Sequence, residues 1–130
     1  MANNLEREFC SYEQALALKE LGFEWQTLNF FDSTTRDFWN WDYFPDINAP
    51  LKQQVFRWFR EKYNLWSSIH PEVYSKEWNY HVQEWSNTEH WGELWQGDSW
   101  DTYEEAENAC IDKLIEIAKQ QDNESNSNRD

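Results

Sequence analysis

Acidic and aromatic side chains crowd into one stretch of the chain, residues 77–112, which carries ten acids and seven Trp or Tyr residues but no lysine or arginine. Because strands place alternate side chains on two faces, they cannot bury all of these rings, and we expect some Trp to lie exposed among carboxylates. Carboxylates steer a basic partner towards such a surface, and exposed Trp anchors it on contact. The predicted partner-binding residues are Trp85, Glu89, Trp91, Glu93, Trp95, Asp98 and Trp100. The alternative is a solvated acidic face that keeps an aromatic protein in solution.

A second cluster is basic and covers residues 52–62, where four bases alternate with aromatic residues in the sequence FRWFREKY and just before it. Packing of the guanidinium groups against rings or acids is one interpretation. The other is contact with an anion or phosphate through Lys52, Arg57 and Arg60. That contact would suit a pocket in which aromatic rings stack on a nucleotide-like small molecule.

The remaining reactive residue types give little support to catalysis. The three histidines, His70, His81 and His90, lack the spacing of a helical metal-binding pair. A turn between the last two would bring them together across two strands, but ordinary sheet histidines are the simpler interpretation and we predict no metal site. Cys110 falls in an apolar stripe, and although Cys10 is a candidate for exposure, nothing near it in sequence would lower its pKa. We therefore predict neither catalytic residues nor a cofactor.

The composition limits the classes to which the protein can belong. The chain has 130 residues, a net charge of −14 and 10 Trp, an aromatic content too high for a disordered chain. The charge argues against direct binding to nucleic acid, which needs bases to neutralise phosphates. No apolar stretch is long enough to span a membrane, the start is too polar for a signal peptide, and two cysteines make no disulfide framework. Cytoplasmic location is the expectation, and it weakens a carbohydrate-binding interpretation of the acids and Trp.

Local signals predict the elements that must position these residues. Ser11 and Gln14 form a capping box that begins a helix over 11–21, and Gly22 can end it. Two aromatic runs within 23–44 predict a β-hairpin. Residues 45–49 are predicted to form a loop, followed by a helix with Pro50 in its first position and Asn64 at its end.

The second half of the chain is predicted to hold two or three strands and one helix. Alternation from Trp78 to Gln83 indicates a half-buried strand, and Thr102 with Glu105 begins the last helix. The fold class that follows is α+β, in a single two-layer domain over 1–119 with one antiparallel sheet of four to five strands and about three helices. Residues 120–130 are predicted to be a disordered polar tail.

Three segments carry a resemblance to known proteins: residues 12–23 (YEQALALKELGF), 49–63 (APLKQQVFRWFREKY) and 102–117 (TYEEAENACIDKLIEI). Together they resemble a family of small uncharacterised proteins carried by bacteriophages and integrated mobile elements. The resemblance covers the three predicted helices and not the strands between them. Since the family has no assigned activity, the resemblance implies only a context, a phage accessory protein acting inside a bacterial cell.

In such a context, the basic partner expected for an acidic surface is a host protein that handles nucleic acid. An acidic surface can occupy the groove in which that protein holds phosphates. The leading prediction is therefore a non-enzymatic inhibitor of a host nucleic-acid-handling or defence protein, acting by nucleic-acid mimicry or steric occlusion. The alternatives are an aromatic-pocket module that sequesters a nucleotide-like small molecule and a virion or assembly component. Membrane binding is not expected.

Overall fold

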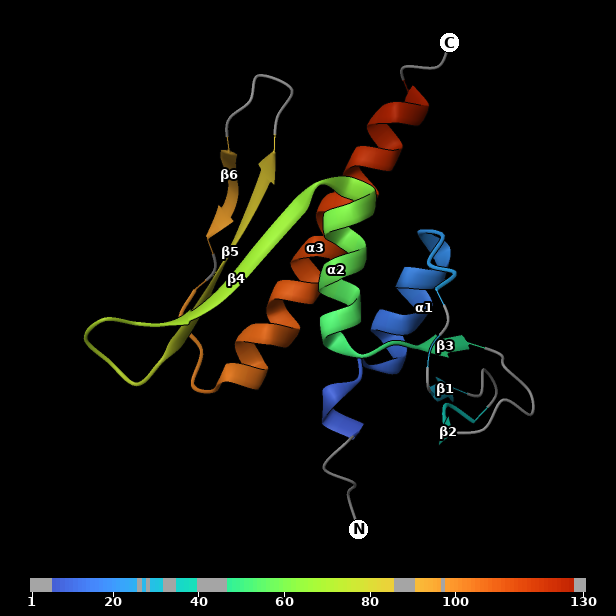
Figure 1. The fold of residues 1–130 in the computed structure, drawn as a ribbon, viewed down its shortest axis with the longest axis horizontal. Coiled ribbons are helices and arrows are strands. Elements are labelled where there is room, and N and C mark those ends of the chain that lie inside the picture. Colours follow the sequence, from blue (N-terminus) through green and yellow to red (C-terminus); the bar gives the residue numbers. More distant parts are fainter. Residues whose placement is uncertain are drawn as a thin grey trace. The chain divides into compact units, whose positions relative to one another are not determined.

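The protein is an α+β protein whose chain divides into two compact units, residues 1–55 and 56–130 (Figure 1). The computed structural model describes residues 6–25, 27, 29–31, 35–39, 47–85, 91–96 and 98–127. The boundary between the units falls within helix α2 (Lys52–Tyr63). Each unit contains a three-stranded sheet.

The first unit combines a short 3₁₀ helix, one α-helix and a small antiparallel sheet with the strand order β2-β1-β3. Its elements are η1 (Glu6–Glu8), α1 (Tyr12–Glu20), β1 (Asn29–Phe31), β2 (Phe38–Trp39) and β3 (Ile47–Ala49). Helix α1 packs beside β3, and buried apolar side chains from both elements meet there. The core of this unit includes Phe9, Ala15, Leu18, Leu21, Phe23, Phe31, Ile47, Ala49 and Val55.

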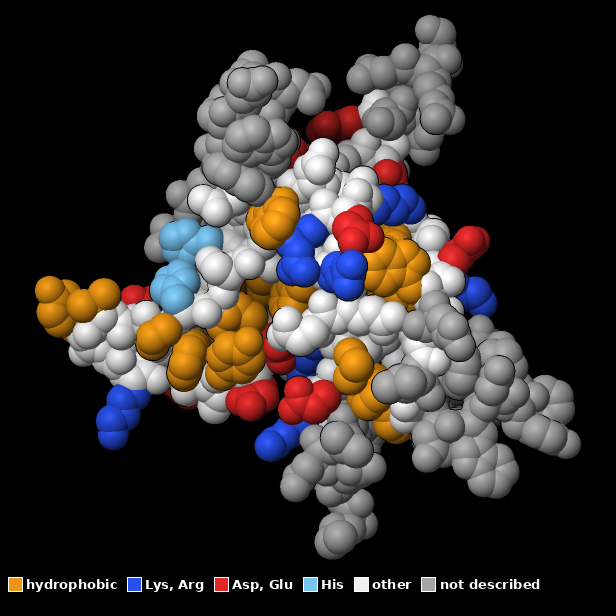
Figure 2. All heavy atoms as spheres, in the orientation of Figure 1, with side chains coloured by type: hydrophobic (Ala, Val, Ile, Leu, Met, Phe, Trp, Pro, Cys, Tyr) orange, Lys and Arg blue, Asp and Glu red, His pale blue; other side chains and the backbone are white. Residues whose placement is uncertain are grey.

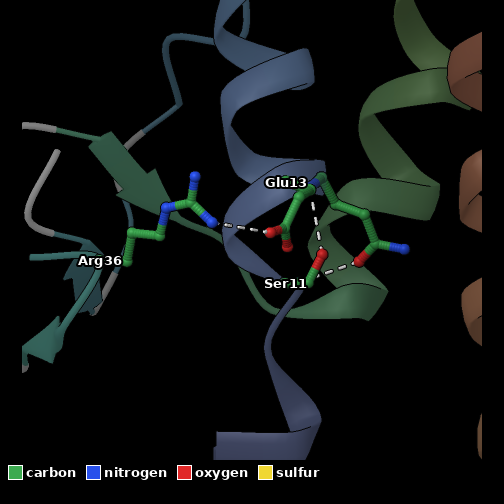
Figure 3. A network of polar contacts seen from close by, with 4 residues as sticks. Ser11, Glu13 and Arg36 are labelled. Atoms are coloured by element: carbon green, nitrogen blue, oxygen red, sulfur yellow. Dashed lines mark hydrogen bonds and ion pairs between the residues drawn. The ribbon is translucent and has the colours of Figure 1, made fainter.

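The beginning and end of α1 follow the local chemistry of the sequence. The Ser11 hydroxyl accepts a hydrogen bond from the Gln14 amide at 3.1 Å, and the Gln14 side chain accepts one from the Ser11 amide at 2.9 Å. Figure 3 shows this capping box beside an exposed ion pair in which Arg36 lies 3.5 Å from Glu13. Gly22 has a φ of 97°, which is the left-handed conformation expected just beyond the helix. The predicted helix over 11–21 is confirmed.

The segment before α2 differs from the prediction. Residues 47–49, predicted to form a loop, are strand β3, which pairs with β1. Pro50 is not the first helical residue, because the first helical hydrogen bond runs from the Val55 amide to the Leu51 carbonyl at 3.0 Å. The Pro50 carbonyl instead accepts a hydrogen bond from the Cys10 amide at 3.0 Å, which ties the two ends of the unit together.

The second unit places one long helix against one face of an antiparallel sheet with the strand order β4-β5-β6. Its strands are β4 (Leu65–Pro71), β5 (Trp78–Trp85) and β6 (Trp91–Gln96), and its helices are the part of α2 that follows Val55 and α3 (Tyr103–Ser127). From the sheet, the core includes Leu65, Tyr80 and Val82, which share a face. From the helices, it includes Phe56, Trp58, Phe59, Ala106, Cys110, Ile111, Leu114, Ile115 and Ala118.

Two side-chain contacts accompany the last turns of α3. The Tyr63 hydroxyl donates a hydrogen bond to Asp122 at 3.0 Å, and the Gln121 amide donates one to Glu84 at 2.7 Å. The structure continues the helix through Ser127, into the segment for which the sequence predicts a disordered tail. The disordered tail was predicted from the polar composition of residues 120–130 alone, and that composition does not indicate contacts with residues far away in the sequence.

The predicted single sheet of four to five strands is not confirmed, since the described residues form two separate sheets of three strands. Strand β3 was not predicted, and it takes one edge of β1 while β2 takes the other. Both edges of β1 are therefore occupied within the first unit, and β1 does not pair with β4, β5 or β6. The hairpin predicted over 23–44 is present as β1 and β2, while Trp41 and Tyr43 lie outside the described residues.

No helix in the described part of the chain is both long enough and apolar enough to cross a membrane.

Candidate functional site

The loop that joins β4 to β5, residues 72–77, is held by a network around one carboxylate. The Glu72 side chain accepts hydrogen bonds from the Asn79 side chain at 3.0 Å and from the Ser99 hydroxyl at 3.2 Å. Across the loop, the Glu72 amide donates to the Glu77 carbonyl at 2.9 Å. Asn79 is only 5% exposed, so this network is anchored in the body of the unit.

The same loop presents two apolar side chains to solvent. Val73 is 83% exposed and Tyr74 is 99% exposed. Figure 2 shows hydrophobic side chains at this end of the β4–β5 hairpin, outside the packed part of the unit. Fully exposed Val and Tyr side chains on a loop held at its base have no role in the core, and such side chains are typical of binding surfaces.

Three half-buried aromatic residues form the base of this loop. Trp78 and Trp100 pair through two backbone hydrogen bonds of 2.7 and 2.8 Å, and Tyr103 packs edge-on against Trp78 with ring centres 5.3 Å apart. The indole N–H of Trp100 is buried and finds no acceptor among the described residues. The bridge brings the segment before α3 to the end of the β4–β5 hairpin.

Exposed carboxylates flank these rings. Thr102 caps α3 by accepting a hydrogen bond from the Glu105 amide at 3.1 Å, as the sequence predicts. This cap places two acids in the first turn of the helix, where the helix dipole favours negative charge. We define the loop-end surface as Val73, Tyr74, Trp78, Asp98, Trp100, Asp101, Tyr103, Glu104 and Glu105. The two segments that build it, residues 72–78 and 98–105, contain six acids and one base.

The structure brings two of the predicted partner-binding residues, Asp98 and Trp100, to this surface. Asp98 is exposed and Trp100 is half-buried. The structure does not describe the side chains of the other five. Glu89 lies entirely outside the described residues. Trp85, Trp91, Glu93 and Trp95 are described as backbone positions of β5 and β6, without their side chains. On the backbone, Trp85 and Trp91 are register partners.

The acids of residues 77–112 do not all contribute to one surface. Glu107 is buried in α3, Glu84 accepts the hydrogen bond from Gln121, and Asp112 is exposed further along the helix. Among the described side chains of this stretch, no Trp is fully exposed, because Trp78 and Trp100 are each half-buried. Val73 and Tyr74, which precede this stretch, are exposed and are not among the predicted partner-binding residues. In the sequence they are a pair of apolar residues within the otherwise polar segment 71–77, PEVYSKE, which begins with a proline. The pair is too short to form a helix or strand of its own.

The basic cluster of α2 is engaged by protein groups. Lys52 is only 4% exposed, although the sequence places it on the polar side of the helix. Arg57 lies 3.1 Å from Glu61 one turn later. Arg60 stacks over the exposed ring of Trp66, with 5.2 Å between the guanidinium carbon and the ring centre. Packing against rings and acids, the first interpretation of this segment, is present at both arginines.

Both cysteines are buried. Burial raises the pKa of the Cys10 thiol to about 12, and a backbone hydrogen bond and the charge of Lys52 offset this only in part. Burial likewise raises the pKa of Cys110 to about 12, against a hydrogen bond with Ser67. A reactive cysteine has a lowered pKa, so the environment of each thiol opposes nucleophilic chemistry. The exposure considered for Cys10 is wrong, because the segment that follows η1 packs into the first unit.

Two of the three histidines lie within the described residues and contact each other. His81 packs against His70 across β4 and β5, with ring centres 4.7 Å apart. His90 lies outside the described residues, so the contact between His81 and His90 considered on sequence grounds is untested. Among the described residues, no group of three or more His, Cys, Asp or Glu residues is placed to hold a metal ion.

Comparisons with protein-family models, with curated proteins and with solved structures find no match for this chain. The resemblance to phage and mobile-element proteins therefore stays a prediction.

Proposed function

We propose that this protein acts by binding, without catalysis, and that it docks a basic protein partner on the loop-end surface. The observation that carries the proposal is the pair of apolar side chains, Val73 and Tyr74, exposed on a loop whose base is held by Glu72. Tyr is enriched among the residues that dominate binding energy at protein interfaces. A loop held at its base loses less conformational entropy when it binds.

Charge supports a basic partner. The exposed acids Asp98, Asp101, Glu104 and Glu105 flank the rings of this surface. Carboxylates grouped in this way accelerate encounter with a positively charged surface and repel acidic competitors. Because exposed charges are screened by salt, the association should weaken as ionic strength rises.

The identity of the partner is the further part of the proposal. A host protein that binds nucleic acid has a basic groove, and an acidic surface that enters the groove would displace the phosphates held there. We propose inhibition of a host nucleic-acid-handling or defence protein in the bacterial cytoplasm, by mimicry or occlusion. The support is the charge of the surface together with the resemblance of the three helical segments to phage accessory proteins.

The test uses three versions of the full chain immobilised against bacterial lysate: wild type, Val73→Ser/Tyr74→Ser, and Leu16→Ser as a matched loss of an exposed apolar side chain elsewhere. The expected result is a nucleic-acid-binding protein that the wild type and the Leu16→Ser variant retain at low salt and release at high salt. Loss of a Tyr hot spot costs about 2 kcal/mol, so the double variant should bind at least about 30-fold more weakly. Added nucleic acid should compete with the wild-type protein for the retained partner and release it. Equal retention by the double variant would contradict the proposal.

A second candidate, binding of a nucleotide-like small molecule, is favoured by the contact between Arg60 and the exposed ring of Trp66. An indole offers a surface for a base, and a guanidinium offers a donor to phosphate. A thermal-shift screen against nucleotides separates the candidates, because a tight ligand raises the melting temperature of the wild type and not of a Trp66→Ala variant. The third candidate is a virion or assembly component, which a homo-oligomer in solution would favour.

A further inference from the structure

The second unit carries a small basic surface as well as the acidic loop-end surface. We define the basic surface as Arg57, Arg60, Glu61, Lys62 and Trp66, which come from the last turns of α2 and the beginning of β4. Residues 57–66 contain three bases and one acid, in a chain whose net charge is −14. Figure 2 shows Lys and Arg side chains (blue) gathered over α2.

The positive charge of this surface is accessible and only partly balanced. The Arg57 guanidinium lies 3.1 Å from the Glu61 carboxylate, and both side chains are more than half exposed. Arg60 lies over the ring of Trp66, which is 45% exposed, and a contact with a ring leaves the charge of the guanidinium in place. Lys62 is exposed and lies over two aromatic rings of α2. The surface can therefore attract carboxylates.

The basic surface and the loop-end surface belong to opposite ends of one strand. Trp66 is the second residue of β4, whereas the loop that carries Val73 and Tyr74 begins after Pro71, the last residue of the strand. A strand rises about 3.3 Å per residue, so the two ends of β4 are about 20 Å apart. Side chains cannot bridge this distance within one chain. A contact between the two surfaces must therefore join two copies of the chain.

We propose that the loop-end surface of one copy docks on the basic surface of a second copy. The inference rests on the docking function proposed above, because it uses the same surface and names a basic partner for it. The two segments that build the loop-end surface contain six acids and one base, which complements the excess of bases in residues 57–66. The contact covers Val73 and Tyr74 on one copy and the exposed part of Trp66 on the other.

The two surfaces are different, so the contact is heterologous and can repeat from copy to copy. The remaining negative charge of the two copies opposes their approach. Because the Debye length is about 8 Å at physiological salt, that repulsion is screened, and the charges that face each other across the contact dominate. A host partner that binds the loop-end surface has to displace the second copy.

Sedimentation velocity of the full chain at about 150 mM salt, over a series of protein concentrations, tests the inference. Arg57→Glu/Arg60→Glu reverses the basic surface, and Asp98→Lys/Asp101→Lys reverses part of the loop-end surface. We expect the wild type to sediment faster as its concentration rises. Each reversed variant should self-associate at least about tenfold more weakly, because like charges then face each other. An equimolar mixture of the two variants should associate again, since the acidic surface of the first faces the basic surface of the second.

Arg7→Glu/Lys19→Glu is the matched control, because it reverses two exposed bases of the first unit and changes the net charge equally. This control should self-associate as the wild type does. A wild type that stays monomeric at every concentration, or a mixture no more associated than its two components, would overturn the inference.

Capture from lysate separates the inference from the proposed function, because the Arg57→Glu/Arg60→Glu variant keeps the loop-end surface. If this variant and the wild type both retain a host protein while the wild type stays monomeric, only the inference about a second copy fails. If the wild type self-associates and neither version retains a host protein, the inference stands and the proposed host partner fails.

Discussion

Replacement of Glu72 by alanine tests whether one carboxylate holds the loop that presents Tyr74. The change removes the acceptor of two hydrogen bonds, from Asn79 at 3.0 Å and from Ser99 at 3.2 Å. Asn79 is buried, so its side-chain N–H loses a partner where water replaces it poorly, at a cost of about 1–3 kcal/mol. Ser99 is exposed and turns to water, which adds little. We expect the free energy of unfolding to fall by about 2 kcal/mol.

Urea denaturation followed by Trp fluorescence measures this change, and hydrogen exchange reports the loop directly. The amide of Glu72, which donates to the Glu77 carbonyl, should exchange faster in the Glu72→Ala variant. Glu72→Gln keeps an acceptor oxygen and should lose about half as much stability. Asp98→Ala removes an exposed acid beside Ser99 and should stay within about 0.5 kcal/mol of the wild type. If Glu72→Ala also stays within that range and its loop amides exchange at the wild-type rate, the reasoning is refuted.

Four further predictions concern the body of the protein. Ser11→Ala removes the capping box of α1 and should lower the free energy of unfolding by about 1 kcal/mol in urea, whereas Ser68→Ala, at an exposed strand position, should have little effect. Tyr63→Phe removes the donor to Asp122 and should expose the last turns of α3 to limited proteolysis, while an unchanged cleavage pattern would contradict the contact. Neither thiol should react with Ellman's reagent at pH 8 until denaturant is added, because burial raises both pKa values to about 12. For the same reason the unfolded chain releases thiol protons first, so stability should fall as the pH rises above 9.0, the ordinary thiol value; no fall in denaturation measured between pH 8 and 10 would contradict this.

Local chemistry in the sequence predicts both ends of α1, the end of α2 and the beginning of α3. The capping box at Ser11, the left-handed Gly22 and Asn64, and the Thr102 cap all depend on residues within one turn. Their outcome is therefore independent of how the rest of the chain packs.

Long-range packing decides what the sequence leaves open. Strand β3 has only three residues and exists because β1 offers it an edge. The last turns of α3 contact Tyr63 and Glu84, which are far away in sequence. The candidate site also has a part that the sequence predicts and a part that depends on packing. The acids of residues 98–105 are evident from the charge along the chain, whereas the exposure of Val73 and Tyr74 depends on where the hairpin ends.

The most direct test of the docking surface is site-specific photo-crosslinking in bacterial cells. A photoreactive phenylalanine analogue replaces Tyr74 in one version of the chain and Leu16, an exposed apolar residue of α1, in another. We expect a discrete crosslink from position 74 to a basic, nucleic-acid-binding protein and no such product from position 16. The same products from both positions, or no product from position 74, would contradict it.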